Sequence, residues 1–508
     1  MEAINIVWFK KDLRLADHAP LYHAVQAGLP VLLMYCFEPS QTQHPSYSER
    51  HSWYAYHSIA DMQQHLKPFG ITIYLSQLEF TQVLETLLPH YQVHTVFAHR
   101  ETAMLHTRQR NEAVAAFCSL NGITFQEFPA TGVLPASQVD PPNWLQQWKT
   151  AIHAPIYTLN LGKITTPDLP KHIVQQFLPP TLPSLIGKSN KQFKPDKAWQ
   201  KPGETNAHEL LTNFILHKAS NGYQKKRGLP HESATASSRL SAPLAFGNIT
   251  IKQIYWQLKQ LKLDSTNQHD LTIFKQQLLA RDYALQMFEM NPQIEQQNLN
   301  YAVNGIRLKW NEALFEAFIQ SKTGFPLVDA AMLCLQKTGF INHRLRALLA
   351  SFVAHHLWLD WRKAAAPIAK LLVDFEPGIF YWNLQNLSSC TGLYPLNILL
   401  PAKEAKRIDK NGLFIKQWLP QFKLIPGALC GHPALLSDLE QQMYHFKPGK
   451  DYPLPIVNIA ETELHAQTQL ERIYQKPIAV KETAKLTAAI LPLPAALQTR
   501  QKALGSKS

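Results

Sequence analysis

A serine-rich segment near the middle of the chain carries side chains that could bind phosphate. Ser237, Ser238 and Ser241 supply hydroxyls just before a run with helical character. Arg239 lies among them and supplies a cation. Phosphate groups bind to hydroxyls, cations and the free amides of a helix start. The segment therefore predicts a pyrophosphate site, and a capped helix beside a solvated basic loop is the alternative.

Charged side chains further along the chain have a spacing that favours a shared surface. His343 and Arg346 are three residues apart, so they lie on one face of a helix. Arg281 stands in another helical run. An arginine that is paired to a carboxylate stays charged and can hold the polar edge of a ligand. A structural ion pair between helices is the alternative.

The cysteines and histidines do not form a metal-binding pattern. The five cysteines are odd in number and form no CxxC pair, which argues against a disulfide scaffold and a four-thiolate site: Cys36, Cys118, Cys334, Cys390 and Cys430. His99 and His106 lack further ligands near them in the sequence, as do the adjacent His355 and His356. We interpret all four as ordinary histidines and predict no metal.

The chain is basic, with a net charge of +13 and a pI of about 9.3. A basic surface attracts polyanions, and counterion release makes nucleic acid a natural partner. A basic but inert surface is the alternative. No apolar segment with a cleavage site opens the chain, and no stretch approaches the ~20 apolar residues that a membrane span needs. We therefore expect a cytoplasmic protein without membrane contact.

The elements that must position these residues fall into two domains. Residues 1–135 alternate strand and helix patterns, which is typical of a parallel sheet with helices on both faces. Strands are expected at 5–9, 30–37, 71–75, 93–98 and 123–128. The sheet is Rossmann-like, yet no GxGxxG follows the first strand, so the usual dinucleotide site is not predicted there.

The rest of the chain has a different character. Residues 136–205 are rich in proline and polar residues and predict an inter-domain connector. Residues 206–475 show helical periodicity and predict an all-α domain. Residues 476–508 lack a strong pattern and are expected to form a flexible tail.

Several segments, in order, resemble the photolyase/cryptochrome family from about residue 3 to residue 475. The likeness is carried by IVWFKKDLRLADHAPL at the start, SSRLSAPLAFGNIT at 237–250, KTGFPLVDAAM at 322–332, INHRLRALLASF at 341–352 and LLVDFEPG at 371–378. The family folds as an α/β domain followed by an α-helical FAD domain, in agreement with the patterns above. The resemblance implies an FAD flavoprotein that absorbs blue light. It leaves room for a second, antenna chromophore of unknown identity.

The resemblance also assigns roles to individual residues. Arg346 and Asp374 match a pair at the edge of the isoalloxazine ring, where a positive charge would stabilise an anionic or reduced flavin. The implied cofactor-binding set is Tyr223, Ser237, Ser238, Arg239, Leu240, Ser241, Gln277, Arg281, His343, Arg346, Asp374 and Glu376. The implied catalytic set is His343, Arg346, Asp374, Trp361 and Trp382.

The substrate pocket departs from that of the photolyases that split cyclobutane dimers. A glutamate, two tryptophans and a methionine in those enzymes correspond here to Gln277, Ala280, Leu387 and Ala347. Flat aromatic rings stack on flipped bases, and their loss weakens binding by roughly 1–3 kcal/mol per base. His343 matches one histidine of the photolyases that repair (6–4) lesions, but their second histidine is replaced by Ala347. His343 is therefore expected to be a flavin or substrate ligand, or else a packed histidine.

The family's electron-transfer tryptophans are also altered. The chain of three maps to Gln385, Trp361 and Phe318, of which only Trp361 keeps an indole. Phenylalanine is much harder to oxidise, so the usual exit to the surface is broken. Tyr381, Trp382 and Trp358 are candidates for another route, and packing is their alternative role.

Contacts to nucleic acid remain an open expectation. Arg344, Lys403 and Lys406 are candidate phosphate contacts. We expect a monomer that binds DNA or signals through a protein partner. The favoured function is a cryptochrome-like photoreceptor, and the alternative is a DNA photolyase in which excited reduced FAD donates an electron to pyrimidine dimers or (6–4) photoproducts. A third hypothesis is a flavoprotein or nucleic-acid-binding module without light chemistry.

Overall fold

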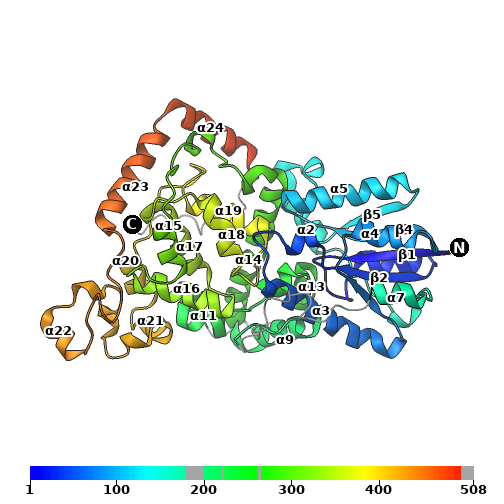
Figure 1. Cartoon of the computed structure of the whole chain (residues 1–508), viewed down its shortest axis with the longest axis horizontal. Helices are drawn as coiled ribbons and strands as arrows, with labels where there is room; N and C mark the ends of the chain where they lie inside the picture. The colour runs from blue at the N-terminus through cyan, green and yellow to red at the C-terminus, as the bar shows by residue number, and fades with distance from the viewer. Residues whose placement is uncertain (178–197, 220–221, 261–264, 493–508) are drawn as a thin grey trace.

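The computed structural model describes residues 1–177, 198–219, 222–260 and 265–492 (Figure 1). The α/β domain and the helical domain lie side by side along the long axis of the molecule. The predicted fold class, an α/β domain followed by an all-α domain, is confirmed.

The N-terminal domain is built on a five-stranded parallel sheet in the order β3-β2-β1-β4-β5. Its strands are β1 (Glu2–Phe9), β2 (Val31–Cys36), β3 (Ile73–Ser76), β4 (Tyr91–Arg100) and β5 (Thr124–Pro129). Its principal helices are α1 (Ala19–Gln26), α3 (Glu49–Leu66), α4 (Phe80–Leu87) and α5 (Leu105–Leu120). All five strands overlap the segments that the sequence predicts as strands.

The two faces of β1 show why the sheet forms here. Val7 and Phe9 pack on one side in a cluster that includes Tyr54 of α3. Ile6 and Trp8 pack on the other side, where the Trp8 indole stacks on the ring of Phe80 at 4.2 Å. Because successive side chains of a strand point to opposite faces, a strand with apolar side chains on both faces needs helices on both sides.

The connector contributes to the helical core. Helix α6 (Trp144–Ile152) buries Trp144, Trp148 and Ile152, which belong to the same hydrophobic cluster as the helical domain. These side chains are four residues apart, so they form one helix face. The connector continues through α7 (Lys171–Gln176), and residues 178–197 lie outside the described residues.

In the described residues of the C-terminal domain, helices and loops make up the fold, apart from one isolated bridge between Pro448 and Tyr452. Its site-forming helices are α11 (Pro230–Ala236), α12 (Ser241–Ala245), α14 (Ser265–Met290), α17 (His343–Ser351) and α19 (Pro377–Leu387). Around them lie α9 (Glu204–Asn213), α10 (Tyr223–Lys226), α13 (Ile251–Gln260), α15 (Glu312–Ile319), α16 (Pro326–Thr338), α18 (Trp361–Ala369), α20 (Pro401–Ile408), α21 (Leu413–Trp418), α22 (Asp438–Met443) and α23 (Ile459–Tyr474). None of the described helices is long and apolar enough to cross a membrane.

The expectation of a flexible tail from residue 476 is wrong for its first part. Residues Pro477–Ala489 form helix α24, whose Ala479 is fully buried. Leu491 is also fully buried, and its carbonyl accepts a hydrogen bond of 2.9 Å from the Tyr283 hydroxyl of α14. The segment is anchored by single apolar residues, which leave too little periodicity to be recognised. Residues 493–508 lie outside the described residues.

The two domains are joined by the most family-like motifs of the sequence. Arg14 donates through Nη1 to the Gly247 carbonyl at 3.1 Å, and the Asn248 amide donates to the Leu13 carbonyl at 2.8 Å. Gly247 has a φ of 67°, and a Cβ there would lie 2.4 Å from the Lys11 carbonyl oxygen. Only glycine permits this backbone conformation together with this close approach. The loop after β1 therefore docks directly on the loop after α12.

Candidate functional site

The serine-rich segment forms the turn between α11 and α12. Arg239 has a φ of 59°, which is uncommon for a residue with a side chain, and its guanidinium lies 3.7 Å from the centre of the Phe340 ring. Burial lowers the pKa of Arg239 to about 10. The Ser237 hydroxyl is buried and has no hydrogen-bond partner in the described chain. A buried polar group requires a partner, so this turn fits a ligand that brings acceptor oxygens, as a phosphate does.

Arg346 and Asp374 form the ion pair that the resemblance implies. Arg346 Nη2 lies 2.7 and 3.0 Å from the two carboxylate oxygens of Asp374, which is almost fully buried. Burial alone would raise the pKa of Asp374, but Arg346 reverses this effect and the pKa is lowered. Ser241 hydrogen-bonds to the same carboxylate. The serine-rich turn and the ion pair therefore belong to one site.

Arg281 on α14 forms a second charged group beside the first. Its Nη2 donates to the Glu376 carboxylate and, at 3.2 Å, to the Leu244 carbonyl of α12. Its Nη1 donates to Asp282 at 2.9 Å. Burial raises the pKa of Glu376 even though Arg281 opposes the shift. Arg281 thus keeps its charge beside two carboxylates and lies next to the serine-rich turn.

A large cavity opens beside these charged groups. It has a volume of about 1220 Å³ and is bounded by α14, α17, α19, the following loop and the helices α23 and α24. The lining includes Gln277, Ala280, Arg281, His343, Trp382 and Leu387. The structure therefore brings together most of the residues that the sequence assigns to the substrate side of the site. Ala347 is buried and does not line this cavity.

Two predicted cofactor contacts are more deeply packed. Tyr223 is buried, and its ring centre lies 5.0 Å from that of Phe214. The Arg227 guanidinium lies 5.7 Å from the centre of the Tyr223 ring. Leu240 is buried at the start of α12, and its amide donates to the Ser238 hydroxyl at 3.4 Å. Their contact with a cofactor stays a prediction.

The three positions of the altered electron-transfer chain are all buried. The Gln385 amide donates to the carbonyls of Ile294 and Gln297 at 2.9 and 2.5 Å, so this residue anchors a neighbouring turn. The Trp361 indole donates to the Asn298 side chain at 2.7 Å. Phe318 is fully buried. The usual positions therefore have packing or hydrogen-bonding roles here.

The candidate DNA contacts lie on α17 and α20, where Arg344 interacts with charges of α20. Lys403 and Lys406 are exposed on α20. Arg344 is partly buried, and burial followed by the charge of Arg407 on α20 lowers its pKa. A cation whose charge is disfavoured gains from an approaching anion, so the arrangement is compatible with phosphate. Binding to DNA stays a prediction.

His99 has hydrogen-bonding partners that the sequence does not indicate. The ring nitrogens of His18 and His99 lie 2.9 and 2.7 Å from the same oxygen of Asp12, and the three ligand atoms lie within 4.8 Å of one another. These are hydrogen-bond distances, and both histidines are buried with lowered pKa values. We interpret the trio as a buried hydrogen-bond network behind the domain-docking loop.

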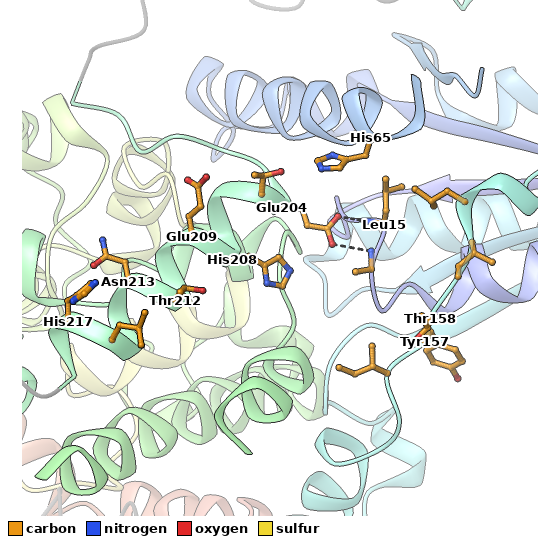
Figure 2. A pocket seen from close by; sticks show the side chains of 16 residues that line it. Leu15, His65, Tyr157, Thr158, Glu204, His208, Glu209, Thr212, Asn213 and His217 are labelled. Atoms are coloured by element: carbon orange, nitrogen blue, oxygen red, sulfur yellow. Dashed lines mark hydrogen bonds between the residues drawn. The ribbon is translucent and has the colours of Figure 1, made fainter. Parts of the chain in front are cut away.

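A second large cavity lies where the two domains meet (Figure 2). It has a volume of about 980 Å³ and is lined by Leu15, Tyr157, His208 and His217 among others. Glu204 on α9 accepts hydrogen bonds from the amides of Leu15 and Ala16 at 2.7 and 3.0 Å and so fixes one wall. The sequence does not indicate this cavity because its lining comes from both domains and the connector.

The fold and the site together define a class of protein. An α/β domain joined to a helical domain with a phosphate-type turn, an Arg–Asp pair and a large cavity is the architecture of an FAD-binding photolyase-type protein. The profile described as DNA photolyase matches residues 5–158, and the profile described as FAD binding domain of DNA photolyase matches residues 274–472. The chain belongs to the photolyase/cryptochrome family.

Known relatives include both branches of that family. A deoxyribodipyrimidine photo-lyase of Alkalihalophilus pseudofirmus is 26% identical over 482 residues, covering 90% of this chain and 95% of the relative. A cryptochrome DASH of Synechocystis sp. is also 26% identical, covering 92% and 98%. The crystal structure of a bacterial class III photolyase from Agrobacterium tumefaciens has a TM-score of 0.78 at 24% identity, covering 94% and 98%. The last likeness is one of fold.

Proposed function

We propose that this protein is a blue-light photoreceptor that binds FAD between α12, α14, α17 and α19. The buried Ser237 hydroxyl and the Arg239 cation would hold the pyrophosphate, and Arg346 and Arg281 would face the polar edge of the flavin ring. The bound flavin supplies blue-light absorption and one-electron chemistry. The chain supplies fixed charges there, which favour the added negative charge of a reduced ring.

The observation that carries the photoreceptor reading is the composition of the cavity wall. Ala280 and Leu387 line the cavity where dimer-splitting photolyases have stacking tryptophans. Tyr474, Thr483 and Thr487 of α23 and α24 line the same cavity. A cavity with fewer flat aromatic surfaces is less suited to a flipped pyrimidine dimer, and the C-terminal helices in its wall are candidates to carry a signal.

The second candidate is a DNA photolyase with an unusual substrate preference. It is supported by the cavity volume of about 1220 Å³, by Trp382 as an aromatic wall, and by the exposed position of His343 at the cavity. Arg344 and the lysines of α20 lie on the outer side of the domain, where they could bind a phosphate backbone.

One experiment separates the two functions. The purified protein is scanned for flavin absorbance and then illuminated with blue light, together with a reductant and oligonucleotides that carry a thymine dimer or a (6–4) product. Light-induced flavin reduction without loss of either lesion supports the photoreceptor. Restoration of intact bases would establish the photolyase. A protein without flavin bands contradicts both.

A second chromophore has a candidate site in the cavity of Figure 2. Its volume of about 980 Å³ would hold a drug-sized aromatic ligand, whereas the cavity near Arg110, which residues of both domains line, measures about 110 Å³. An antenna bound there would add an excitation band to the action spectrum of flavin reduction. Substitution of His208 by tryptophan would remove that band.

A further inference from the structure

Four aromatic rings form a continuous line from the large cavity into the connector. Trp382 lines the cavity, and its ring centre lies 6.1 Å from that of Tyr283. Tyr283 lies 5.6 Å from Trp144, and Trp144 lies 6.5 Å from Trp148. The side chains are 5%, 3%, 1% and 3% exposed, so the line runs through the protein interior. Indoles and phenols are the side chains that give up one electron most readily.

The line also reaches the surface. The Trp148 ring centre lies 5.9 Å from that of Tyr255 on α13, and Tyr255 is only partly buried. The exposed His153 lies 5.7 Å beyond it. A reductant in solution can therefore approach the end of the line.

The positions of the family's usual electron-transfer tryptophans offer no such path to the surface. Trp361 contacts one other ring in the described chain, that of Tyr381 at 6.2 Å. The next position, Phe318, is fully buried and contacts the rings of Phe315 and Phe352. Phenyl rings resist oxidation, so this branch ends inside the protein.

Trp148 differs from Trp144 and Tyr283 in its hydrogen-bond acceptor. Its Nε1 donates to the Asp282 carboxylate at 2.9 Å, whereas Trp144 donates to the neutral Gln286 amide and Tyr283 to a backbone carbonyl. A Cβ on Gly132 would lie 2.6 Å from the Trp148 ring and 3.2 Å from Asp282, so the backbone covers this pair closely. Burial raises the pKa of Asp282, although Arg281 opposes the shift, and a raised pKa makes the carboxylate a better proton acceptor.

We propose that the line Trp382–Tyr283–Trp144–Trp148 conducts electrons to the photoexcited flavin, and that Asp282 accepts the proton of oxidised Trp148. The proposal rests on the FAD site proposed above. Trp382 gives one electron to the flavin. The oxidised Trp382 is then reduced by an electron that passes from Trp148 through Trp144 and Tyr283. Trp148 then releases its Nε1 proton to Asp282 Oδ2, which leaves a neutral indole radical and a neutral carboxylic acid.

The cycle closes with an external thiol. A thiolate at the surface gives one electron through Tyr255 to the Trp148 radical and becomes a thiyl radical. The proton returns from Asp282 to Trp148 Nε1. The balance is one electron from thiolate to flavin, with no net change of protons on Trp148 or Asp282.

The test uses the full-length, FAD-loaded protein and transient absorption after a blue flash. In Trp144→Phe, the yield of the long-lived neutral indole radical should fall about tenfold while the FAD content stays equal to that of the wild type. The Gln286 amide keeps its hydrogen bonds to residue 134, so the substitution leaves no acceptor stranded. Trp310→Phe, a tryptophan outside the line, is the matched control and should keep the yield within about twofold.

A second variant and a second measurement keep the proposal testable even if Trp144→Phe misfolds. In Asp282→Asn, the radical should keep the spectrum of a protonated indole, and its decay should lose the solvent deuterium isotope effect. After illumination in air, peptide mapping should find oxidised Trp148 in the wild type in preference to oxidised Trp361.

The outcomes separate the route from the site on which it rests. A wild-type protein without FAD would overturn the proposed function and the route together. A neutral-radical yield that persists in Trp144→Phe and falls in Trp361→Phe would overturn the route alone. An Asp282→Asn protein with unchanged radical spectrum and isotope effect would exclude Asp282 as the proton acceptor.

Discussion

A single nitrogen of Arg346, Nη2, lies within hydrogen-bond distance of both carboxylate oxygens of Asp374, at 2.7 and 3.0 Å. Asp374 is 7% exposed, so its charge depends on this partner. Removal of one member of a buried pair leaves an uncompensated charge, whereas removal of both does not. The pair therefore tests whether the centre of the proposed flavin site is held by electrostatics.

Arg346→Met should lower the free energy of unfolding of the flavin-free protein by up to about 3 kcal/mol at neutral pH, because the buried Asp374 carboxylate loses its ion-pair partner and keeps the Ser241 hydrogen bond and the charge of Arg239. The double variant Arg346→Met, Asp374→Asn should recover part of this loss. Denaturant titration at pH 7 of Arg346→Met, Asp374→Asn and the double variant measures the three values. If the double variant is as unstable as the sum of the two single variants, the pair has no coupling energy and this account of the site is wrong.

The docking of the two domains depends on the close approach at Gly247. Gly247→Ala should cost at least about 2 kcal/mol, because its Cβ would overlap the Lys11 carbonyl in a left-handed backbone conformation. Gly28→Ala is the matched control: its φ is 77°, but no atom lies within 4 Å of an added Cβ. It should lose only the backbone preference, about 1 kcal/mol. Equal losses, measured by thermal or chemical unfolding, would contradict a steric role for the docking loop.

These motifs mark the limit of what the sequence predicts. Strand periodicity located the sheet, and the order of motifs indicated the FAD domain. The same motifs did not reveal that Arg14 and Gly247 form the domain joint, because a contact between residues 233 positions apart has no local signature. Trp144 and Trp148 carried a helical spacing, but the surrounding prolines led to the prediction of a connector without a core role.

For several site residues the sequence predicts a place in the site but not the side chains with which they interact. The resemblance places Arg281 at the flavin, whereas its ion pairs with Glu376 and with the adjacent Asp282 are established only by the structure. Gln385 stands where the family has an electron-transfer tryptophan, and in the structure its side-chain amide donates a hydrogen bond to the Gln297 carbonyl and so holds the turn there. Substituted positions in a family motif reveal what is lost, whereas the new role depends on neighbours from other elements.

The buried trio of Asp12, His18 and His99 predicts a pH dependence of stability. Burial lowers the pKa of both histidines, that of His99 to about 3, whereas in the unfolded chain each takes up a proton near pH 6.5. The unfolded state therefore binds more protons below pH 6.5, so stability is fully present above that pH and is lost as the pH falls towards 3.

The expected slope is up to about 2.7 kcal/mol per pH unit for two histidines in the acid range. Asp12, whose pKa is held well below its ordinary value by the two histidines against the effect of burial, adds a loss of the same sign at still lower pH. Urea titrations between pH 7 and 4.5 measure the slope. The double variant His18→Asn, His99→Asn should lower the measured slope by up to this amount, while His51 and His355, whose pKa values burial also lowers, keep their own contributions. An unchanged slope would assign the acid sensitivity to those other groups.

The last prediction concerns the cavity wall, where restoring one aromatic ring should increase the affinity for damaged DNA. Ala280 lines a cavity of about 1220 Å³, so there is room for an indole at this position. Ala280→Trp should tighten the binding of an oligonucleotide with a thymine dimer about tenfold, since one base-stacking ring contributes about 1–3 kcal/mol. Ala280→Leu adds apolar volume without a flat ring and should change the affinity less than threefold. Fluorescence anisotropy at fixed salt, with undamaged DNA as the reference, measures both affinities. If the tryptophan variant gains nothing, or gains equally for undamaged DNA, the altered wall does not limit dimer binding, and helices α23 and α24 become the explanation to test.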